Sequence, residues 1–222
     1  MALKDGNEAS TYIIQSQEEE IKRIALELHE GISQNLYSLY TGLGFLETGI
    51  EDPHMRSYAK EMATLMERTI QEVRLLSVEL YPNTLTTLGL ISALKSYSKL
   101  YTSTFGILVN FESTGDEKVM SERKSMAVFR VCQEALINIA KYADATNVTI
   151  RFTWEEKLVK IQIEDYGKGF DVIEVMKRNH FTGIAAMKER MVLAGGKCHV
   201  TSELANGTTV SISLPIQREG EF

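Results

Sequence analysis

The chain has 222 residues, a net charge of −6 and 44% hydrophobic residues, which is typical of a folded protein with one or two domains. Its acidic balance argues against nucleic acid as the main partner. No apolar run approaches the roughly 20 residues of a membrane helix, so we expect a cytoplasmic chain, or the cytoplasmic part of a longer membrane-bound protein. Four scattered histidines give no zinc pattern, and Cys132 and Cys198 are expected as buried thiols.

The first half of the chain is predicted to be a helical hairpin. Apolar residues recur at spacings of three and four from Ile21 to Ile50, which indicates a long amphipathic helix. Pro53 ends this pattern, and a second helical pattern then continues to Tyr81, before Pro82. Each apolar stripe is too long for one partner helix to cover. We therefore expect the hairpin to form a homodimeric four-helix bundle, with packing against the rest of the same chain as the alternative.

The second half alternates between helical and strand patterns. Helices are expected at 88–104, 121–142 and 183–194, and strands at 107–111, 146–154, 158–164, 197–202 and 208–214. Asn206-Gly207 between the last two strands is a strong hairpin-turn signal. The sequence thus divides into a polar N-terminal segment, a helical hairpin and an α/β domain, with the bounds 1–15, 16–82 and 83–222.

One histidine in the first helix is a candidate reactive group. His29 follows the stripe residue Leu28, about 100° further around the helix axis, so its ring is expected at the rim of the stripe and open to solvent. Glu30 comes next, and Gln34 lies one turn beyond it. An imidazole beside a carboxylate and an amide on a rigid support can take up and release a chemical group. A plain surface histidine is the more common outcome for such a segment.

The helix predicted at 121–142 carries a polar face with Arg130, Glu134, Asn138 and Lys141 at spacings of three and four. The carboxylate and amide oxygens of this face can coordinate Mg²⁺, and its cations can neutralise phosphates. A solvated face without a ligand is the more common outcome for a single helix.

An Asp-x-Gly-x-Gly loop follows the strand predicted at 158–164. A carboxylate at the end of a strand, here Asp165, can accept a hydrogen bond from an exocyclic amine such as that of adenine. Gly167 and Gly169 let the backbone turn sharply and approach a ligand, although a plain turn would also use them. The sequence lacks the Walker phosphate loop, the G-x-S-x-G elbow and the serine/threonine kinase motifs.

Taken in order, these motifs resemble the transmitter core of bacterial sensor histidine kinases, in the class that partners NarL-type response regulators and is represented by DesK and DegS. The similarity extends over about 20–215. The matching segments are the phosphoacceptor motif at 23–34, the linker at Pro82 and 88–94, the N-box at 133–138, the first glycine box at 165–170, the next helix at 183–190 and the last box at Gly207-Thr208.

The resemblance implies a dimeric four-helix bundle of helical hairpins followed by an ATPase α/β sandwich of the gyrase and histidine kinase type. Its implied activity is ATP-dependent autophosphorylation of His29, phosphotransfer to an aspartate of a response regulator, and phosphatase activity toward that regulator. Glu30 would orient and deprotonate the imidazole, and Gln34 would position water for dephosphorylation. Residues 81–87 would be the linker about which the ATPase half moves.

ATP and Mg²⁺ are the cofactors that the resemblance implies. Glu134 and Asn138 would hold the magnesium ion, and Lys141 would lie near the phosphates. Asp165 and Thr208 would recognise adenine. Three glycines would frame a short lid over the nucleotide, namely Gly167, Gly169 and Gly183.

Several positions depart from the pattern of this class. Glu30 stands where the class usually has aspartate, and Tyr142 stands where it has histidine. The lid lacks its usual paired glycines, with Phe181 and Ala186 in their places. Two further hypotheses therefore remain open: a nucleotide-binding scaffold with weak or no kinase activity, and an anti-sigma-type serine kinase. A helical hairpin that carries His29 argues against the second.

Overall fold

The computed structural model describes residues 19–172 and 182–216. The chain forms two compact units, of which the first ends at Asn83 and the second begins at Thr84. The predicted N-terminal segment 1–15 lies outside the described residues. None of the described helices combines the length and the apolar character that crossing a bilayer requires.

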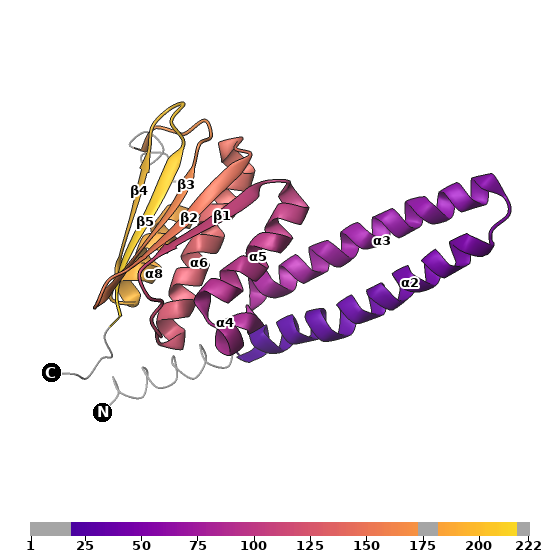
Figure 1. Ribbon diagram of the computed structural model, residues 1–222, viewed down its shortest axis with the longest axis horizontal. Helices are drawn as coiled ribbons and strands as arrows, with labels where there is room; N and C mark the ends of the chain where they lie inside the picture. The colour runs from indigo at the N-terminus through magenta and orange to yellow at the C-terminus, as the bar shows by residue number, and fades with distance from the viewer. Residues whose placement is uncertain (1–18, 173–181, 217–222) are drawn as a thin grey trace, which may run out of the picture. The chain divides into compact units, whose positions relative to one another are not determined.

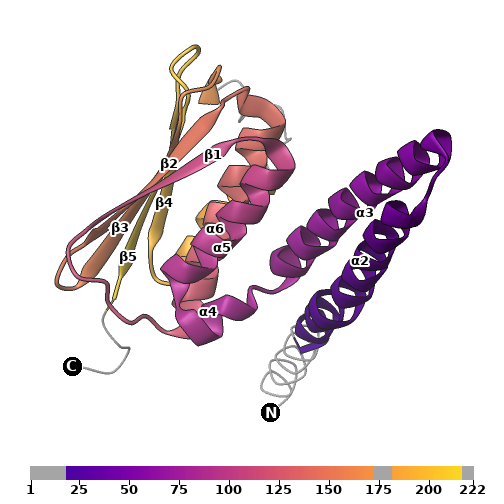
Figure 2. The same ribbon diagram turned by 45° about the vertical axis from the view of Figure 1, so that its right-hand side comes forward.

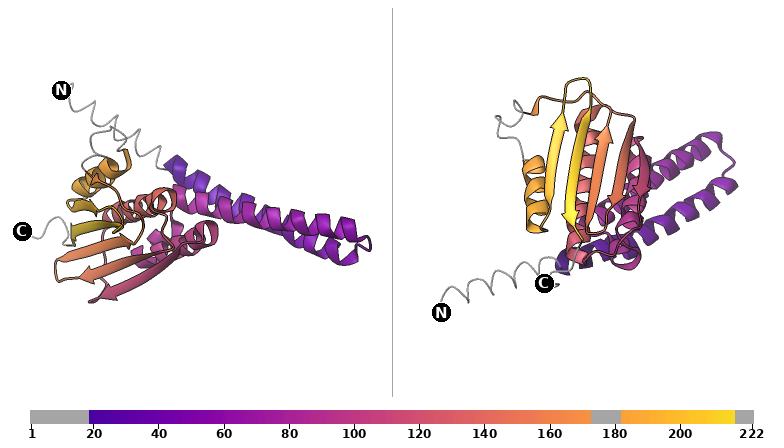
Figure 3. Two further views of the ribbon diagram at one scale, coloured as in Figure 1. Left: turned by 90° about the horizontal axis from the view of Figure 1, so that it is seen from above. Right: turned by 60° about the vertical axis from the view of Figure 1, so that its left-hand side comes forward.

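The first unit is the predicted helical hairpin. Its first arm is helical from residue 19 and continues through the π-helical turn η1 (Glu27–Ile32) into α2 (Ser33–Gly49), and its second arm is α3 (Pro53–Leu80). The helices α2 and α3 lie side by side and antiparallel (Figures 1 and 3). The side chain of Asp52 caps α3 by accepting hydrogen bonds from two backbone N–H groups, and Pro53 occupies the first turn, where no N–H partner is needed.

The first arm is not the regular α-helix that its apolar spacing predicts. A π turn widens it around His29, because the backbone there bonds over five residues instead of four. Two buried hydroxyl groups support this turn: Ser33 Oγ donates to the carbonyl of Leu28 at 2.9 Å, and Ser77 Oγ of α3 donates to the carbonyl of Ala25 at 2.8 Å. Side-chain spacing alone does not reveal such a turn, because the apolar residues still fall three or four positions apart.

Many apolar side chains of the hairpin are exposed. Phe45 is 78% exposed and Leu39 is 60% exposed, although both belong to a long helix of a folded unit. Further exposed apolar residues of the hairpin are Ile24, Ile32, Leu46, Met55, Tyr58 and Leu65. One partner helix therefore leaves much of the apolar surface of the hairpin uncovered.

The second unit is a five-stranded sheet with helices packed on one face, as Figure 2 shows. The strand order is β1-β2-β3-β5-β4, in which β1 and β2 are parallel and all other neighbours are antiparallel. Its elements are α4 (Asn83–Leu88), α5 (Leu90–Phe105), β1 (Leu108–Thr114), α6 (Glu122–Asn138), η2 (Ile139–Ala143), β2 (Asn147–Trp154), β3 (Leu158–Asp165), α8 (Thr182–Leu193), β4 (Lys197–Ser202) and β5 (Thr208–Pro215).

The core of this unit lies between the sheet and its helices. Side chains alternate between buried and more exposed along β2 and β3, so each strand presents one apolar face to the helices. Tyr97, Tyr101 and Phe129 fill the space between α5 and α6. Cys132 and Cys198 are buried free thiols, as predicted, and burial raises the pKa of Cys132 to about 12.

The predicted elements of the second unit are present, although several differ in extent. The strand predicted at 107–111 runs from Leu108 to Thr114. The helix predicted at 121–142 ends in a second π segment, η2. Part of the segment that we expected as a plain linker, 81–87, forms the short helix α4. This helix has only six residues, which is too short for apolar periodicity to reveal.

Candidate functional site

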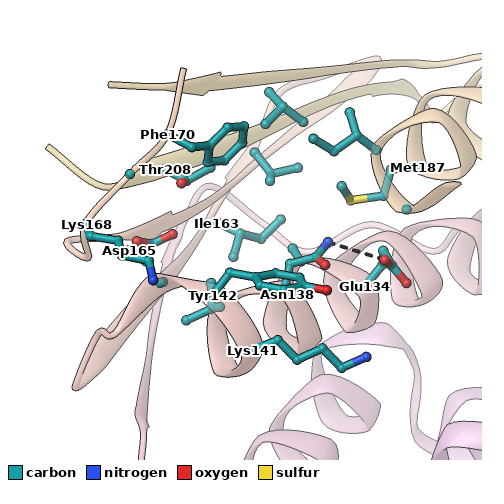
Figure 4. Close-up of a pocket in the computed structure, with 18 residues that line it drawn as sticks. Glu134, Asn138, Lys141, Tyr142, Ile163, Asp165, Lys168, Phe170, Met187 and Thr208 are labelled. Carbon is teal, nitrogen blue, oxygen red and sulfur yellow. Dashed lines mark hydrogen bonds between the residues drawn. The ribbon is translucent and has the colours of Figure 1, made fainter. Parts of the chain in front are cut away.

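A pocket of about 540 Å³ opens in the second unit, between the α6–η2 helix and the ends of β3 and β5 (Figure 4). Its walls combine apolar side chains with a few polar groups, which is the usual composition of a small-molecule site. The predicted site residues that line it are Glu134, Asn138, Lys141, Asp165, Gly169, Gly183 and Thr208.

Asp165 and Thr208 form one end of the pocket. They lie directly opposite each other in the antiparallel β3–β5 pair. Asp165 is only 2% exposed, and its Oδ1 accepts a hydrogen bond from the backbone N–H of Gly167 at 2.9 Å. Burial raises the pKa of Asp165, while hydrogen bonds from Gly167 and Thr208 partly oppose that rise. A buried carboxylate with acceptor capacity at the pocket wall is suited to a ligand that donates a hydrogen bond.

The glycine loop after β3 needs its glycines for close backbone contacts. Gly169 has φ +58°, in the left-handed region, and a Cβ atom there would overlap the carbonyl oxygen of Glu203. Gly167 does not line the pocket itself, but it holds Asp165 through its N–H group and packs against the backbone of Ala143. These two glycines therefore shape the loop beside the pocket.

Glu134 and Asn138 form the other end of the pocket, where Asn138 Nδ2 donates to Glu134 Oε1 at 3.3 Å (Figure 4). Gly183 at the start of α8 lies so close that a Cβ atom there would overlap Glu134 Oε1. Among the described residues, no group of three His, Cys, Asp or Glu side chains could hold a metal ion. A cation at Glu134 and Asn138 would thus need further oxygen ligands, such as those of phosphates and water.

Several pocket residues were not predicted as site residues. Phe170, Ile163 and Met187 supply apolar walls, and Tyr142, 63% exposed, lies on the α6–η2 side. In the sequence, Tyr142 stands out only as a departure from the pattern of the histidine kinase class. Its position three residues after Ile139 and four after Asn138 is the signal that places it beside the pocket. Phe181 of the expected lid lies outside the described residues.

A second hollow lies in the first unit, around His29. His29, Glu30 and Gln34 are all exposed and line it together, as the sequence predicts. The full set of lining residues is His29, Glu30, Ser33, Gln34, Tyr37, Ser38 and Arg74. We call this set the histidine groove. Arg74 of α3 was missed, because its place opposite His29 depends on how the two arms of the hairpin pair.

Comparison with known proteins assigns both units to families. Residues 20–85 match the family described as "Histidine kinase", and residues 123–218 match "Histidine kinase-, DNA gyrase B-, and HSP90-like ATPase". The chain is 33% identical, over 98% of its length, to the signal transduction histidine-protein kinase/phosphatase DegS of Brevibacillus brevis. It is 34% identical, over 91% of its length, to the oxygen sensor histidine kinase NreB of Staphylococcus carnosus (strain TM300). It spans 58% of each relative.

Solved structures agree with the fold. The histidine kinase domain of the Erythrobacter litoralis EL346 blue-light activated histidine kinase superposes with a TM-score of 0.51, at 15% sequence identity, and the match covers 82% of this chain and 94% of that one. At this identity the likeness concerns the fold alone. Together with the two family matches, the helical hairpin and the ATPase sheet show that the chain belongs to the sensor histidine kinases and contains a histidine kinase segment followed by an ATPase module.

Proposed function

We propose that this chain transfers the γ-phosphoryl group of ATP to His29 and then to an aspartate of a response regulator of the NarL type. The observation that carries this proposal is the pairing of two features: an exposed histidine in a helical groove, and a pocket with a buried carboxylate in an ATPase module. The two features belong to different compact units, so the proposed transfer requires the nucleotide pocket of one unit to reach the histidine groove of another.

In the ATPase module, Asp165 accepts a hydrogen bond from the exocyclic amine of adenine, beside Thr208. Glu134 and Asn138 hold a magnesium ion together with phosphate oxygens, which fits their adjacent oxygen atoms and the lack of a complete protein ligand set among the described residues. When bound, the ion neutralises negative charge on the phosphates. Lys141 adds a cation on the same side of the pocket.

At the histidine groove, the imidazole of His29 attacks the γ-phosphorus. An N–P bond forms, the bond from the γ-phosphorus to the bridging oxygen breaks, and ADP leaves. Glu30 holds the tautomer that exposes the attacking nitrogen and takes the proton from the other. Phosphoryl transfer depends on positioning and charge neutralisation more than on covalent help from the protein, which suits a groove on a rigid helix.

Labelling with γ-³²P-ATP and magnesium tests this proposal. Wild type should gain label that is labile in acid and stable in base, as expected for phosphohistidine, and His29→Gln should gain none. His54→Gln, at another exposed histidine of the same hairpin, is the matched control and should label like wild type. ATP binding without any label would support the scaffold hypothesis instead. Acid-stable label would support serine chemistry.

The phosphatase activity is tested at Gln34, which lines the histidine groove and can position a water molecule against an aspartyl phosphate. Gln34→Ala should autophosphorylate normally but remove phosphate from a phosphorylated NarL-type regulator at least about tenfold more slowly. Asn35→Ala, at the next residue, which is also exposed, is the control. Unchanged dephosphorylation in Gln34→Ala would exclude Gln34 from the mechanism.

A further inference from the structure

Two contacts near the open end of the hairpin establish which residues of its arms face each other. Lys22 Nζ lies 5.1 Å from the ring centre of Tyr81, and Ser77 Oγ donates to the carbonyl of Ala25. Between these two contacts, the position moves three residues forward along the first arm, from Lys22 to Ala25. It moves four residues back along the second arm, from Tyr81 to Ser77. One more turn in the same direction brings His29 level with Arg74. The two residues indeed line the same groove.

Arg74 is the only lysine or arginine among the residues that line the histidine groove in the described part of the chain. Its side chain is half-buried, and no hydrogen bond or ion pair of its guanidinium occurs within residues 19–172 and 182–216. A half-buried guanidinium without a carboxylate partner has the capacity to bind an anion through several N–H donors at once.

Two of the other side-chain donors of the groove are committed to the backbone, and the amide of Gln34 and the hydroxyl of Tyr37 are neutral donors. Ser33 Oγ donates to the carbonyl of Leu28 at 2.9 Å, and Ser38 Oγ donates to the carbonyl of Gln34 at 3.0 Å. Glu30 is an acceptor and repels an anion. The guanidinium of Arg74 is therefore the strongest available donor to an anion bound beside His29.

We infer that Arg74 binds the phosphoryl group on His29 and neutralises part of its charge. This inference rests on the proposed function, since it takes His29 as the residue that carries the phosphoryl group. The group can reach His29 from ATP or from the acyl phosphate of a regulator, and Arg74 would face the same three oxygens in both cases. A planar guanidinium matches phosphoryl oxygens in a bidentate arrangement that a lysine cannot reproduce.

Phosphoramidate offers a test that does not need the ATPase module. An imidazole nitrogen of the protein attacks the phosphorus of phosphoramidate. A new N–P bond forms to the imidazole, the original P–N bond breaks, and ammonia leaves. In the full chain, ³¹P NMR follows the growth of phosphohistidine, and the signal that is missing in His29→Gln identifies position 29. The charged or titratable residues that line the groove are His29, Glu30, Tyr37 and Arg74, so the contribution of Arg74 is the difference between the pH titrations of this signal in wild type and in an Arg74 variant.

In Arg74→Gln, phosphorylation of His29 should be about tenfold slower, as expected for the loss of a charge-assisted hydrogen bond. The pKa of the bound phosphoryl group should be higher by about 1, because a nearby cation favours the dianion. Arg74→Lys should restore much of the pKa but less of the rate. Arg68→Gln removes the same charge from an exposed site on the same helix and should match wild type in both.

Two further arms distinguish the source of the phosphoryl group. In Arg74→Gln, slower labelling from γ-³²P-ATP at unchanged ATP affinity would show that Arg74 binds the phosphoryl group during its transfer from ATP. Slower transfer of label from a phosphorylated NarL-type regulator to His29 would show that Arg74 binds the phosphoryl group during its transfer from the acyl phosphate. Either result supports the inference.

The outcomes that overturn the inference differ from those that overturn the proposed function. If Arg74→Gln gains phosphohistidine at the wild-type rate, with an unchanged phosphoryl pKa, the inference is wrong and the proposed function stands. If wild type gains none at His29 from ATP or from phosphoramidate, both fail.

Discussion

Asp165 shows how a single residue can cost stability and serve binding. The strand β3 carries it into the core, where it is almost fully buried and receives hydrogen bonds from Gly167 and Thr208. These bonds do not fully offset desolvation, since the pKa of the carboxyl group remains above its ordinary value of 3.8. A carboxylate that is unfavourable in the empty pocket is suited to a ligand that donates a hydrogen bond to it.

Asp165→Asn should weaken ATP binding at least about tenfold, measured by calorimetry, because the amide can present a donor where adenine needs an acceptor. It should not lower the melting temperature at pH 7. Since folding raises the pKa of Asp165, the stability that its proton provides is present below pH 3.8 and is lost as the pH rises through the folded value. Any gain in the stability of Asp165→Asn over wild type should therefore become smaller as the pH falls.

Asp116→Asn, which changes an exposed loop carboxylate in the same unit, is the control for this experiment. It should leave both ATP affinity and melting temperature unchanged. Near-normal ATP affinity in Asp165→Asn would mean that this carboxylate does not accept a hydrogen bond from adenine.

At the scale of secondary-structure elements, α6 and α8 pack against each other, and Gly183 of α8 lies against Glu134 of α6. The carboxylate of Glu134 occupies the space that a Cβ atom at position 183 would need, and this carboxylate is the flexible end of its side chain. A methyl group there can be accommodated if the carboxylate turns aside, so its effect should fall on binding more than on folding.

Gly183→Ala should thus keep its melting temperature within about 1 °C of wild type but bind magnesium-ATP several-fold more weakly, because Glu134 is displaced from its place beside Asn138. Ala185→Ser, at an exposed position of the same helix, is the matched control. Equal magnesium-ATP affinity in both variants would show that the position of Glu134 does not matter for nucleotide binding.

At the scale of the whole molecule, the exposed apolar side chains of the hairpin account for the proposed homodimer. Fully burying one large apolar side chain contributes about 1.5–3 kcal/mol, and several such side chains remain uncovered on α2 and α3. A second hairpin that covered them would complete a four-helix bundle. Symmetric pairing would place two histidine grooves in each assembly.

Leu39→Glu should convert the dimer to a monomer, because it places a charge within a surface that the bundle would bury. Sedimentation equilibrium measures this directly. Thr41→Glu adds the same charge at an exposed polar position on the opposite side of the same helix and should remain dimeric. A wild-type chain that sediments as a monomer at micromolar concentration would contradict the dimer.

The short-range features of this protein follow from its sequence. Prolines and capping residues such as Asp52 and Ser121 mark helix ends, since each removes or satisfies a backbone N–H group. Alternation along β2 and β3 shows which face of the sheet is apolar. The sequence likewise predicted residues that line each hollow. Helical spacing places Glu30 and Gln34 beside His29 in one, whereas the joint role of Asp165 and Thr208 in the other was implied by the resemblance to histidine kinases, since these two residues lie on different strands.

Only the tertiary structure decided the features that depend on distant segments meeting. The π turn that carries His29 is supported by Ser77, far along the chain, and no local pattern encodes that contact. Arg74 faces His29 because of the register of two antiparallel helices. Gly183 leaves space for the carboxylate of Glu134 because α8 packs against α6. Periodicity reports which face of an element is apolar, whereas contacts between elements depend on packing that the whole fold determines.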